Sequence, residues 1–599
     1  MEIQLVKDIN IGGKAIAYII SFELRQAFNT HHSFELRFNH DHIGAPGLIT
    51  LDDSRDLVGK TLTASFGLTT GKQQKFAGVV TSVELTQSHG YHGVIIASGY
   101  SPTILIDRGP DLGSYYNKTL AAIVNLVTHD TPANDLRVVS NPDRKKPVDY
   151  VMQYRESDFD FLNRLSAEYY EWFFYDGVSL NFGKPGNQTE VALVYGRDIQ
   201  RLQYGIELAP IKNTRFAYFP QQDQLLQGQS AGNAAGRPDL VHAANTSGTT
   251  YSKTFNQPAL IRVENNGDIK DLVDNEEKAS TSQLLKISGR GDNPEVSIGK
   301  IIDVSMSINQ GAGFETKSLG KFLVTSVTHS IDNEGRYSNQ FEGIVSTAER
   351  IPFSGYQRPD PEMLLAEVFD NADPMGQGRV RVKFKWLCET NDPTEWLRVI
   401  TPDAGSSNKV TKNRGFVFIP EKGDQVVIGF EDGNIARPIV MGSVFHGKNG
   451  IGGSSNNDRK SLTTKSGHTL SMDDSGGILV KDKTDLNFIA IDGKNAITVN
   501  TDNNITLQTG KVMIIMDKEK DKIIIQAKNI EIRAADDFLL TGDGAPARNG
   551  NMEFDEKLQI SSQKELSMVG GSTANLNGKD VTITGARTSI DGSPVKINS

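Results

Sequence analysis

Residues 560–597 read ISSQKELSMVGGSTANLNGKDVTITGARTSIDGSPVKI, a repeat with one apolar residue at every seventh or eighth position. Glycines stand two residues behind four of these apolar positions, at Gly570, Gly578, Gly585 and Gly592. A period this short leaves room for one strand of about three or four residues and one turn per repeat. Glycine supplies the backbone angles that such turns need. The repeat therefore predicts a solenoid-like structure with very short rungs.

A rung of this length is too small to be stable in a single chain. Its one apolar residue contributes about 1.5–3 kcal/mol when buried, whereas each of its about seven residues costs about 1–2 kcal/mol to order. Three copies wound about one axis would meet at these residues and pair one another's open strand edges. We therefore predict an intertwined trimeric β-helix or β-prism, with a single-chain β-helix or a β-meander as the alternative. The predicted axis residues are Ile560, Met568, Leu576, Ile583, Ile590 and Ile597.

The repeat extends in a less regular form back to Ser461. Short β-branched runs recur there, at 496–499, 505–507, 513–516 and 523–525. We interpret residues 461–599 as a β-repeat needle. Residues 447–460, which are rich in glycine and serine, are predicted to be a flexible linker.

A compact block of short strands at 362–446 precedes this linker. Its clearest strand, RVRVKFKW at 379–386, alternates apolar with basic residues, which is typical of a half-buried strand. About five short strands with Gly and Pro at their turns suit a small OB-type barrel. Further strands of the block are expected around 397–399, 415–419 and 426–430.

The first 355 residues are predicted to be an α+β region. Period-two alternation at 33–38 indicates strands, and apolar residues from Leu120 to Val127 stand at helical spacing. A second helix is expected after Ser157, which can serve as its N-cap. The polar stretch 221–250 has no apolar periodicity, so we interpret it as a long loop. The fold class is therefore mainly β, with helices confined to this region.

Composition limits the classes of function. The net charge of −10, from 73 acidic and 63 basic residues, argues against general polyanion binding. The single cysteine, Cys388, excludes an intrachain disulfide and a cysteine-based zinc finger. The longest apolar runs are too short to span a bilayer, and the start MEIQLVKDINIGGK has no signal-peptide features. We expect no stable membrane anchoring.

Three segments together resemble the VgrG proteins of type VI secretion. The first is YRESDFDFLNRL at 154–165, the second is GRVRVKFKW at 378–386, and the third is RGFVFIPEKGDQVVIGFEDGNIARPIVMGSVFH at 414–446. With the C-terminal repeat, the resemblance covers essentially the whole chain. It implies a phage-hub-like base at 1–355, an OB-fold barrel at 362–446 and a trimeric spike at 461–599.

The resemblance also implies partners and a location. The expected partners are two further copies of the chain, the Hcp tube, a PAAR-type tip protein, effectors or adaptors, and baseplate proteins. The protein would be assembled in the cytoplasm and expelled by the contractile apparatus. The expected function is a mechanical spike. The segment expected to bind the tip protein consists of Val595, Lys596, Ile597, Asn598 and Ser599.

No catalytic, cofactor or metal site is expected. Only some fifteen residues separate Phe445 from Ser461 and two follow Ile597, whereas a catalytic domain needs at least about 50 residues. No HExxH, GxSxG or Walker motif occurs. The histidines His31, His32, His40 and His42 lack a pattern that would complete a metal shell.

Three other hypotheses remain open. The basic face formed by Arg379, Arg381, Lys383 and Lys385 could bind nucleic acid, although we interpret it as a solvated or intersubunit strand face. A phage-like tail spike or hub could adhere to a surface carbohydrate. A hydrolase could lie within residues 1–355.

Overall fold

The computed structural model describes residues 5–43, 51–52, 54–69, 71–87, 93–309, 314–353, 355–450, 454–541 and 551–596. The chain divides into two compact units, Met1–Gly477 and Ile478–Ser599. Both units are built mainly from β-strands, so the predicted mainly β fold class is confirmed. The intertwined trimeric form of the needle stays a prediction.

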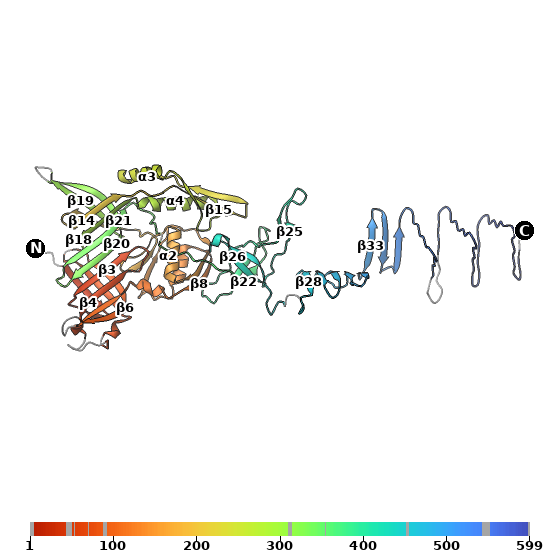
Figure 1. The fold of residues 1–599 in the computed structure, drawn as a ribbon, viewed down its shortest axis with the longest axis horizontal. Coiled ribbons are helices and arrows are strands. Elements are labelled where there is room, and N and C mark those ends of the chain that lie inside the picture. The colour runs from red at the N-terminus through yellow and green to blue at the C-terminus, as the bar shows by residue number, and fades with distance from the viewer. Residues whose placement is uncertain are drawn as a thin grey trace. The chain divides into compact units, whose positions relative to one another are not determined.

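A mixed sheet of thirteen strands forms the largest part of the first unit (Figure 1). The strand β19 pairs both with β13 and with β20, so six strands close into a ring. In spatial order the sheet contains β19 (Ile301–Asn309), β13 (Glu190–Tyr195), β14 (Ile199–Ile206), β18 (Leu285–Gly291), β21 (Tyr337–Val345), β20 (Phe314–Asp332), β3 (Ser21–Ala27), β4 (Ser33–Asn39), β7 (Gly93–Tyr100), β6 (Gln74–Gln87), β5 (Thr61–Leu68), β1 (Leu5–Ile11) and β2 (Lys14–Ala15).

Three smaller sheets complete the base region. They pair β8 (Asp111–Lys118) with β10 (Val148–Glu156), β9 (Arg137–Ser140) and β11 (Phe173–Tyr175) with β12 (Ser179–Phe182), and β16 (Gln224–Gln229) and β17 (Phe255–Pro258) with β15 (Asn213–Phe219). β11 and β12 are buried at every residue, so both of their faces are covered. Together with the large sheet, the three smaller sheets enclose two hydrophobic cores.

In the part of the chain that the structure describes, four α-helices accompany these sheets: α1 (Leu120–Thr128), α2 (Asp158–Glu168), α3 (Pro238–Thr250) and α4 (Asn266–Ser282). The two predicted helices are confirmed as α1 and α2. The Ser157 side chain accepts a hydrogen bond from the backbone N–H of Asp160, 3.1 Å away, and so caps α2. The prediction of a loop at 221–250 is wrong, because β16 and α3 occupy most of it.

The OB block is a four-stranded antiparallel sheet in the order β23 (Arg381–Phe384), β22 (Leu364–Asp370), β26 (Gln425–Phe430) and β27 (Pro438–Ser443). The strand predicted at 426–430 is therefore confirmed. The residues around 397–399 form only isolated bridges, Val380 with Leu397 and Val399 with Val440. The strand predicted at 415–419 is reduced to a short hairpin of β24 (Ala404–Gly405) and β25 (Arg414–Gly415).

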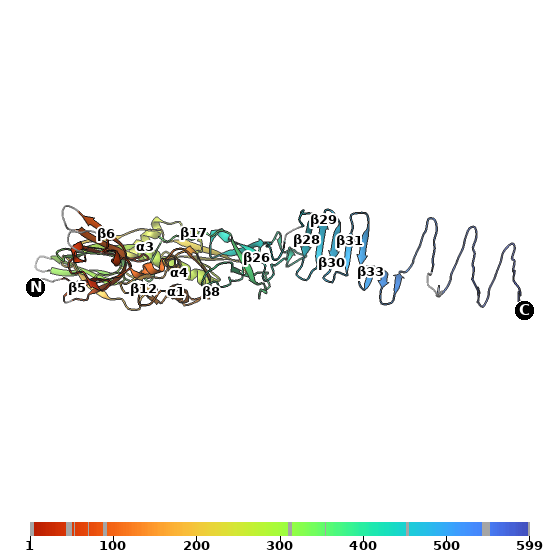
Figure 2. The same ribbon diagram turned by 90° about the horizontal axis from the view of Figure 1, so that it is seen from below.

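The first unit ends with the antiparallel pair β28 (Arg459–Thr463) and β29 (Thr469–Asp473). The second unit begins with a meander of β30 (Ile478–Lys481), β31 (Phe488–Ile491) and β32 (Ile497–Asn500). A second meander follows, of β33 (Asn504–Thr509), β34 (Val512–Asp517) and β35 (Lys522–Gln526). Figure 2 shows the chain running back and forth within this unit. Among the described residues from 527 to 596, no helix or strand is formed.

Candidate assembly site

The first meander of the second unit has one face made only of aliphatic side chains. Its antiparallel register places Ile478 opposite Ile491, and Ile491 opposite Ile497. Val480 likewise lies opposite Ile489, which in turn lies opposite Val499. Every one of these six side chains is between 41% and 70% exposed. An aliphatic face of this size without a cover is unfavourable in water.

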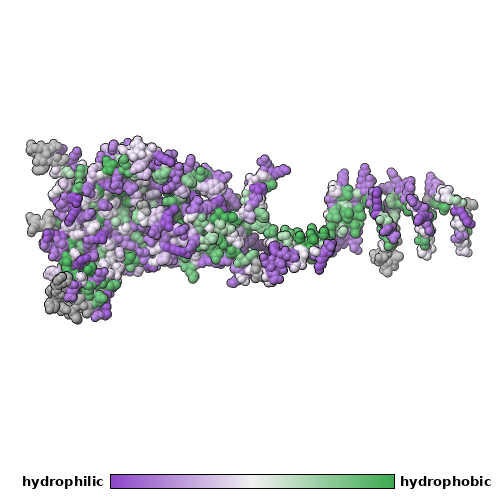
Figure 3. Space-filling view, viewed as in Figure 1, coloured by the Kyte–Doolittle hydropathy of each residue, from purple (hydrophilic) through white to green (hydrophobic). Residues whose placement is uncertain are grey.

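The second meander repeats this arrangement. In it Ile505, Met516 and Ile523 lie directly opposite one another, as do Leu507, Ile514 and Ile525. Figure 3 shows hydrophobic surface over this meander. Each strand thus presents two apolar residues to one face. We name the two faces together the aliphatic face of residues 478–526.

The predicted axis residues of the repeat are also exposed in the single chain. The exposed fractions are 57% for Ile560, 66% for Met568 and Leu576, 64% for Ile583 and 65% for Ile590. The sixth predicted axis residue, Ile597, lies outside the described residues, as do Asn598 and Ser599 of the expected tip-binding segment. Val595 of that segment is 45% exposed.

The strands within 478–526 pair with their neighbours in the same chain. In the single chain these strands form meanders, and β32, β33 and β35 each keep one edge without a partner strand among the described residues. Within the described residues, the aliphatic face of each meander nevertheless stays largely exposed. Both the apolar face and these strand edges are therefore left without a partner in the described part of the chain.

Strand β10 of the base region contributes to the core of the OB block. Tyr150, Met152 and Tyr154, on one face of β10, are buried with residues of β22, β23, β26 and β27. On the other face of the same strand, Val151 packs into the base core. One strand therefore belongs to two hydrophobic cores, which joins the base region to the OB block.

Hydrogen bonds reinforce this junction. The backbone N–H of Ser114, in β8, donates to the carbonyl of Thr390, and the N–H of Asp392 donates back to the carbonyl of Ser114. The carboxylate of Asp392 also pairs with Lys118, at 2.9 Å. Arg262 bridges Asp149 of β10 and Glu395 of the OB block. The first unit is therefore held together across the predicted boundary at 355–362.

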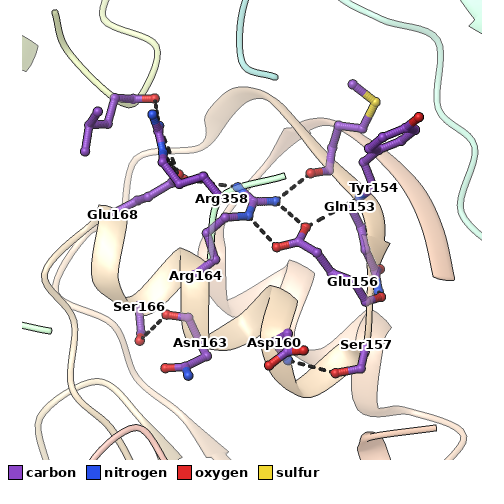
Figure 4. A network of polar contacts seen from close by, with 12 residues as sticks. Gln153, Tyr154, Glu156, Ser157, Asp160, Asn163, Arg164, Ser166, Glu168 and Arg358 are labelled. Carbon is purple, nitrogen blue, oxygen red and sulfur yellow. Dashed lines mark hydrogen bonds and ion pairs between the residues drawn. The ribbon is translucent and has the colours of Figure 1, made fainter. Parts of the chain in front are cut away.

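A buried ionic network lies where β10 turns into α2 (Figure 4). Arg164 donates two hydrogen bonds to Glu156, at 2.7 and 2.8 Å, and one to Glu168, at 3.2 Å. It also donates to the carbonyl of Met152 at 2.8 Å. Arg358 pairs with the other oxygen of Glu168 at 3.3 Å. Because Arg358 lies in the segment leading to the OB block, the network ties β10, α2 and that segment together.

The charges in this network are balanced. Burial by itself would lower the pKa of Arg164, which is 2% exposed, but the charges of Glu168 and Glu156 outweigh burial and leave the pKa raised. Arg164 therefore stays charged. A buried arginine that satisfies two carboxylates is a structural arrangement. The adjacent groove is lined by Tyr154, Asp160, Arg358 and Asp360, among others.

The predicted basic face of 379–386 is not a uniform phosphate-binding surface. Arg379 is 5% exposed and forms a bidentate pair with Asp373. The guanidinium of Arg381 lies 4.2 Å from the centre of the Tyr116 ring. Lys385 pairs with Glu367 at 2.8 Å. Val380, Val382 and Phe384, on the opposite face, are buried in the OB core, as the alternation predicts.

The four histidines considered as metal ligands have other surroundings. His31 stacks on Phe159 with 3.7 Å between ring centres, and His42 stacks on Tyr18. His32 and His40 are fully buried. Within the described residues, no group of three or more His, Cys, Asp or Glu side chains could hold a metal ion. None of the helices in the described part of the chain has the length and apolar content to cross a membrane.

Two family models match the chain in the regions just described. The model of the phage tail baseplate hub matches residues 29–335, which is half of the sequence. The chain belongs to the phage tail baseplate hub family. The model of the type VI secretion system and phage-baseplate injector OB domain matches residues 364–445. The predictions of a hub-like base and of an OB-fold block are therefore confirmed.

Relatives of this hub protein include VgrG spike proteins, so the chain is VgrG-like. It is 26% identical to type VI secretion system spike protein VgrG5 of Pseudomonas aeruginosa, over 54% of this chain and 43% of the relative. It is 23% identical to VgrG1a of the same organism, over 65% of this chain and 62% of the relative. The actin cross-linking toxin VgrG1 of Vibrio cholerae is 21% identical over 56% of this chain and 32% of the toxin. The chain thus matches less than two thirds of the length of each relative.

A solved structure shares the fold of this hub protein. The lidded PdpA-VgrG complex of Francisella superposes with a TM-score of 0.52, at 8% identity, over 84% of this chain and 80% of the other chain. Its lidless form gives a TM-score of 0.51 at 8% identity, over 84% of this chain and 98% of the other. At this identity the likeness concerns the fold alone.

Proposed function

We propose that three copies of this chain form a non-enzymatic spike at the tip of a contractile secretion apparatus. The proposal is supported by the aliphatic face of residues 478–526, which a single chain leaves open. Three such faces turned toward a common axis would bury one another. Burying an aliphatic side chain that is half exposed contributes on the order of 1 kcal/mol, and each meander offers six.

The organisation proposed for this spike follows the predicted boundaries. Residues 1–355 would form the base that docks on the Hcp tube and the baseplate, and residues 362–446 the OB barrel. Residues 447–460 would link it to the needle at 461–599, with a PAAR-type protein bound at 595–599. Effectors or adaptors would travel with the needle. The spike would be assembled in the cytoplasm, perforate the target envelope and leave the cell when the apparatus contracts.

The mechanism would be mechanical. Contraction supplies the work, and the trimer must transmit it without bending. The shared core of β10 and the Arg164 network support this role, because both join the base region to the OB block. No residue needs to change its covalent state, so no catalytic group is assigned.

Adhesion to a carbohydrate is less well supported. Sugar-binding surfaces rely on exposed aromatic rings. Residues 461–599 contain only three aromatic residues, Phe488, Phe538 and Phe554, and these are separated along the sequence. The match of residues 29–335 to the phage tail baseplate hub model favours a structural role for residues 1–355 over a hidden hydrolase.

Sedimentation equilibrium of the purified chain tests the proposal. We expect a mass three times the chain mass of 65.6 kDa. A folded single chain at micromolar concentration would contradict it. Peptidoglycan digestion by the same sample provides the second measurement, and we expect no release of soluble fragments above a buffer control.

A further inference from the structure

A hairpin arm extends from the OB block. It comprises residues 402–418, all of which are exposed. Strands β24 and β25 lie within it, and Figure 1 shows β25 standing away from the rest of the block. Figure 3 shows that polar residues cover its outer end. A solitary two-stranded hairpin is at best marginally stable in water, so this arm needs a contact beyond the single chain.

The base of the arm is nevertheless well defined. The Arg414 guanidinium pairs with the Asp403 carboxylate at 2.8 Å, and the N–H of Phe416 donates to the carbonyl of Asp403 at 2.9 Å. Gly415 has a φ of +114°, and a Cβ added there would lie 2.0 Å from the Asp403 carbonyl oxygen. Only glycine fits this close crossing of the two strands. The arm therefore has a fixed shape rather than an arbitrary one.

Apolar side chains line both faces of the arm near its base. Successive residues of an extended chain point in opposite directions, so Phe416 and Phe418 lie on one face and Val417 on the other. The three are 51%, 57% and 59% exposed, and Val410 nearer the tip is 45% exposed. A segment with apolar side chains exposed on both sides is suited to being covered on both sides.

The charge of the arm is opposite to that of the block that carries it. The arm has three basic residues, Lys409, Lys412 and Arg414, and one acidic residue, Asp403. The remainder of the block, 362–401 and 419–446, has eleven acidic and seven basic residues. Two identical blocks would therefore attract each other when the arm of one lies on the other.

We propose that the arm docks onto the OB block of a second copy of this chain. The receiving surface includes exposed apolar residues of β22 and β27, Leu365 and Met441, and the nearby Phe445, which are 49%, 45% and 71% exposed. This inference rests on the proposed trimer. It adds a contact between copies that lies in the OB blocks and not in the needle. In a ring of three copies, each arm would lie on the OB block of the next copy, so three identical contacts would complete the ring.

Photochemical cross-linking within the full chain tests the contact. The chain is made as Val417→p-benzoylphenylalanine and co-expressed with a wild-type copy that carries a different tag. Irradiation is expected to yield a covalent adduct that contains both tags. The second copy is then made with both Leu365→Asp and Met441→Asp. This change should lower the yield of the adduct about tenfold, because charges replace the apolar side chains of the receiving surface.

The control places a charge elsewhere on the arm. When the second copy carries Thr411→Asp instead, the yield of the two-tag adduct should be unchanged. Thr411 is exposed near the tip of the arm and is not part of the receiving surface. Sedimentation of the unmodified chain separates the two proposals. A trimer without a two-tag adduct, or with an adduct only to a different protein, overturns the docking of the arm alone. A single chain overturns both.

Discussion

At the scale of single residues, buried charged and polar groups hold the base region in one arrangement. Arg164 satisfies Glu156 and Glu168 at once. A second buried set crosses four segments: the Gln26 side chain links the rings of His32 and His329, at 3.1 Å each, and His329 contacts the Tyr337 hydroxyl at 2.6 Å. Both sets form only when distant parts of the sequence come together.

Replacing Arg164 by methionine should destabilise the base region strongly. The substitution keeps the length of the side chain but leaves two buried carboxylates without their partner, which costs about 3–5 kcal/mol. Urea unfolding followed by tryptophan fluorescence measures the change. The matched control is Arg336→Met, where the side chain is 70% exposed and a surface ion pair contributes at most about 1 kcal/mol. Equal losses in the two variants would contradict the role assigned to Arg164.

Stability should fall as the solution becomes more acidic. Burial lowers the pKa of His32 to about 3 and that of His329 to about 3, below the ordinary value near 6.5. The folded state therefore keeps both rings neutral while the unfolded state takes up protons below about pH 6.5. The contribution of the two histidines to the free energy of unfolding is therefore fully present above about pH 6.5. It falls by about 2.7 kcal/mol per pH unit as the pH decreases toward 3.

Urea midpoints at pH 7.5, 6 and 5 measure this loss. In His329→Gln one of the two groups is absent, so the slope of stability against pH should fall by about half. The same substitution at His242, which is exposed on α3, serves as the control. A flat pH profile in the wild-type chain would show that the two rings are not held neutral by the fold.

At the scale of elements, the aliphatic face and the opposite face of the first meander are not equivalent. Ile491→Asp puts a charge on the aliphatic face, and in a trimer three such charges would lie close together. We expect loss of the trimer, measured by sedimentation velocity. Thr498→Asp puts the same charge in the same sheet on the other face, opposite Ala490, and should leave the mass unchanged. If the Ile491→Asp variant is still a trimer, the aliphatic face does not face the threefold axis.

The repeat at 560–597 allows a separate test. Ile583→Asp should weaken the trimer and lower its melting temperature, because Ile583 is one of the predicted axis residues. Thr582→Asp, one position away and also exposed, should have little effect. Differential scanning calorimetry distinguishes the two variants, and identical melting curves would contradict the predicted register.

Sequence patterns predicted some elements well and others poorly, for physical reasons. α2 was predictable because Ser157 caps a clear apolar stripe. α3 was not, since its buried face consists of Leu240 with small residues such as Ala243 and Ala244. α4 was missed because Glu276, buried in a pair with Arg215 at 2.7 Å, interrupts its apolar stripe.

The assembly site was predictable in part. The recurrent β-branched runs indicated an apolar surface in need of partners, but they did not give the pairing of the strands. Only the register of the meanders shows that six side chains of each share one face. The strand predicted at 415–419 overlaps the end of the arm. The apolar run Phe416, Val417 and Phe418 favoured a strand, but it did not show that all three side chains stay exposed.

At the scale of the whole molecule, the second unit is expected to strengthen association. A fragment ending at Gly477 lacks the aliphatic face of 478–526 and the repeat, and retains only the OB block and base for contact between copies. We expect it to dissociate at higher concentration than the full chain in sedimentation equilibrium. Equal dissociation constants would mean that the needle adds nothing to assembly.

The strand β10 has a practical consequence for engineering this family. Tyr150, Met152 and Tyr154 complete the OB core from more than 200 positions upstream of its own strands. An expression fragment that begins near residue 360 would lack these three side chains and so part of its hydrophobic core, even if its ends match a domain boundary. Likewise, a chimera that exchanges OB blocks between two homologues should also exchange residues 148–156. Otherwise the side chains of β10 would not fit the core of the transferred block.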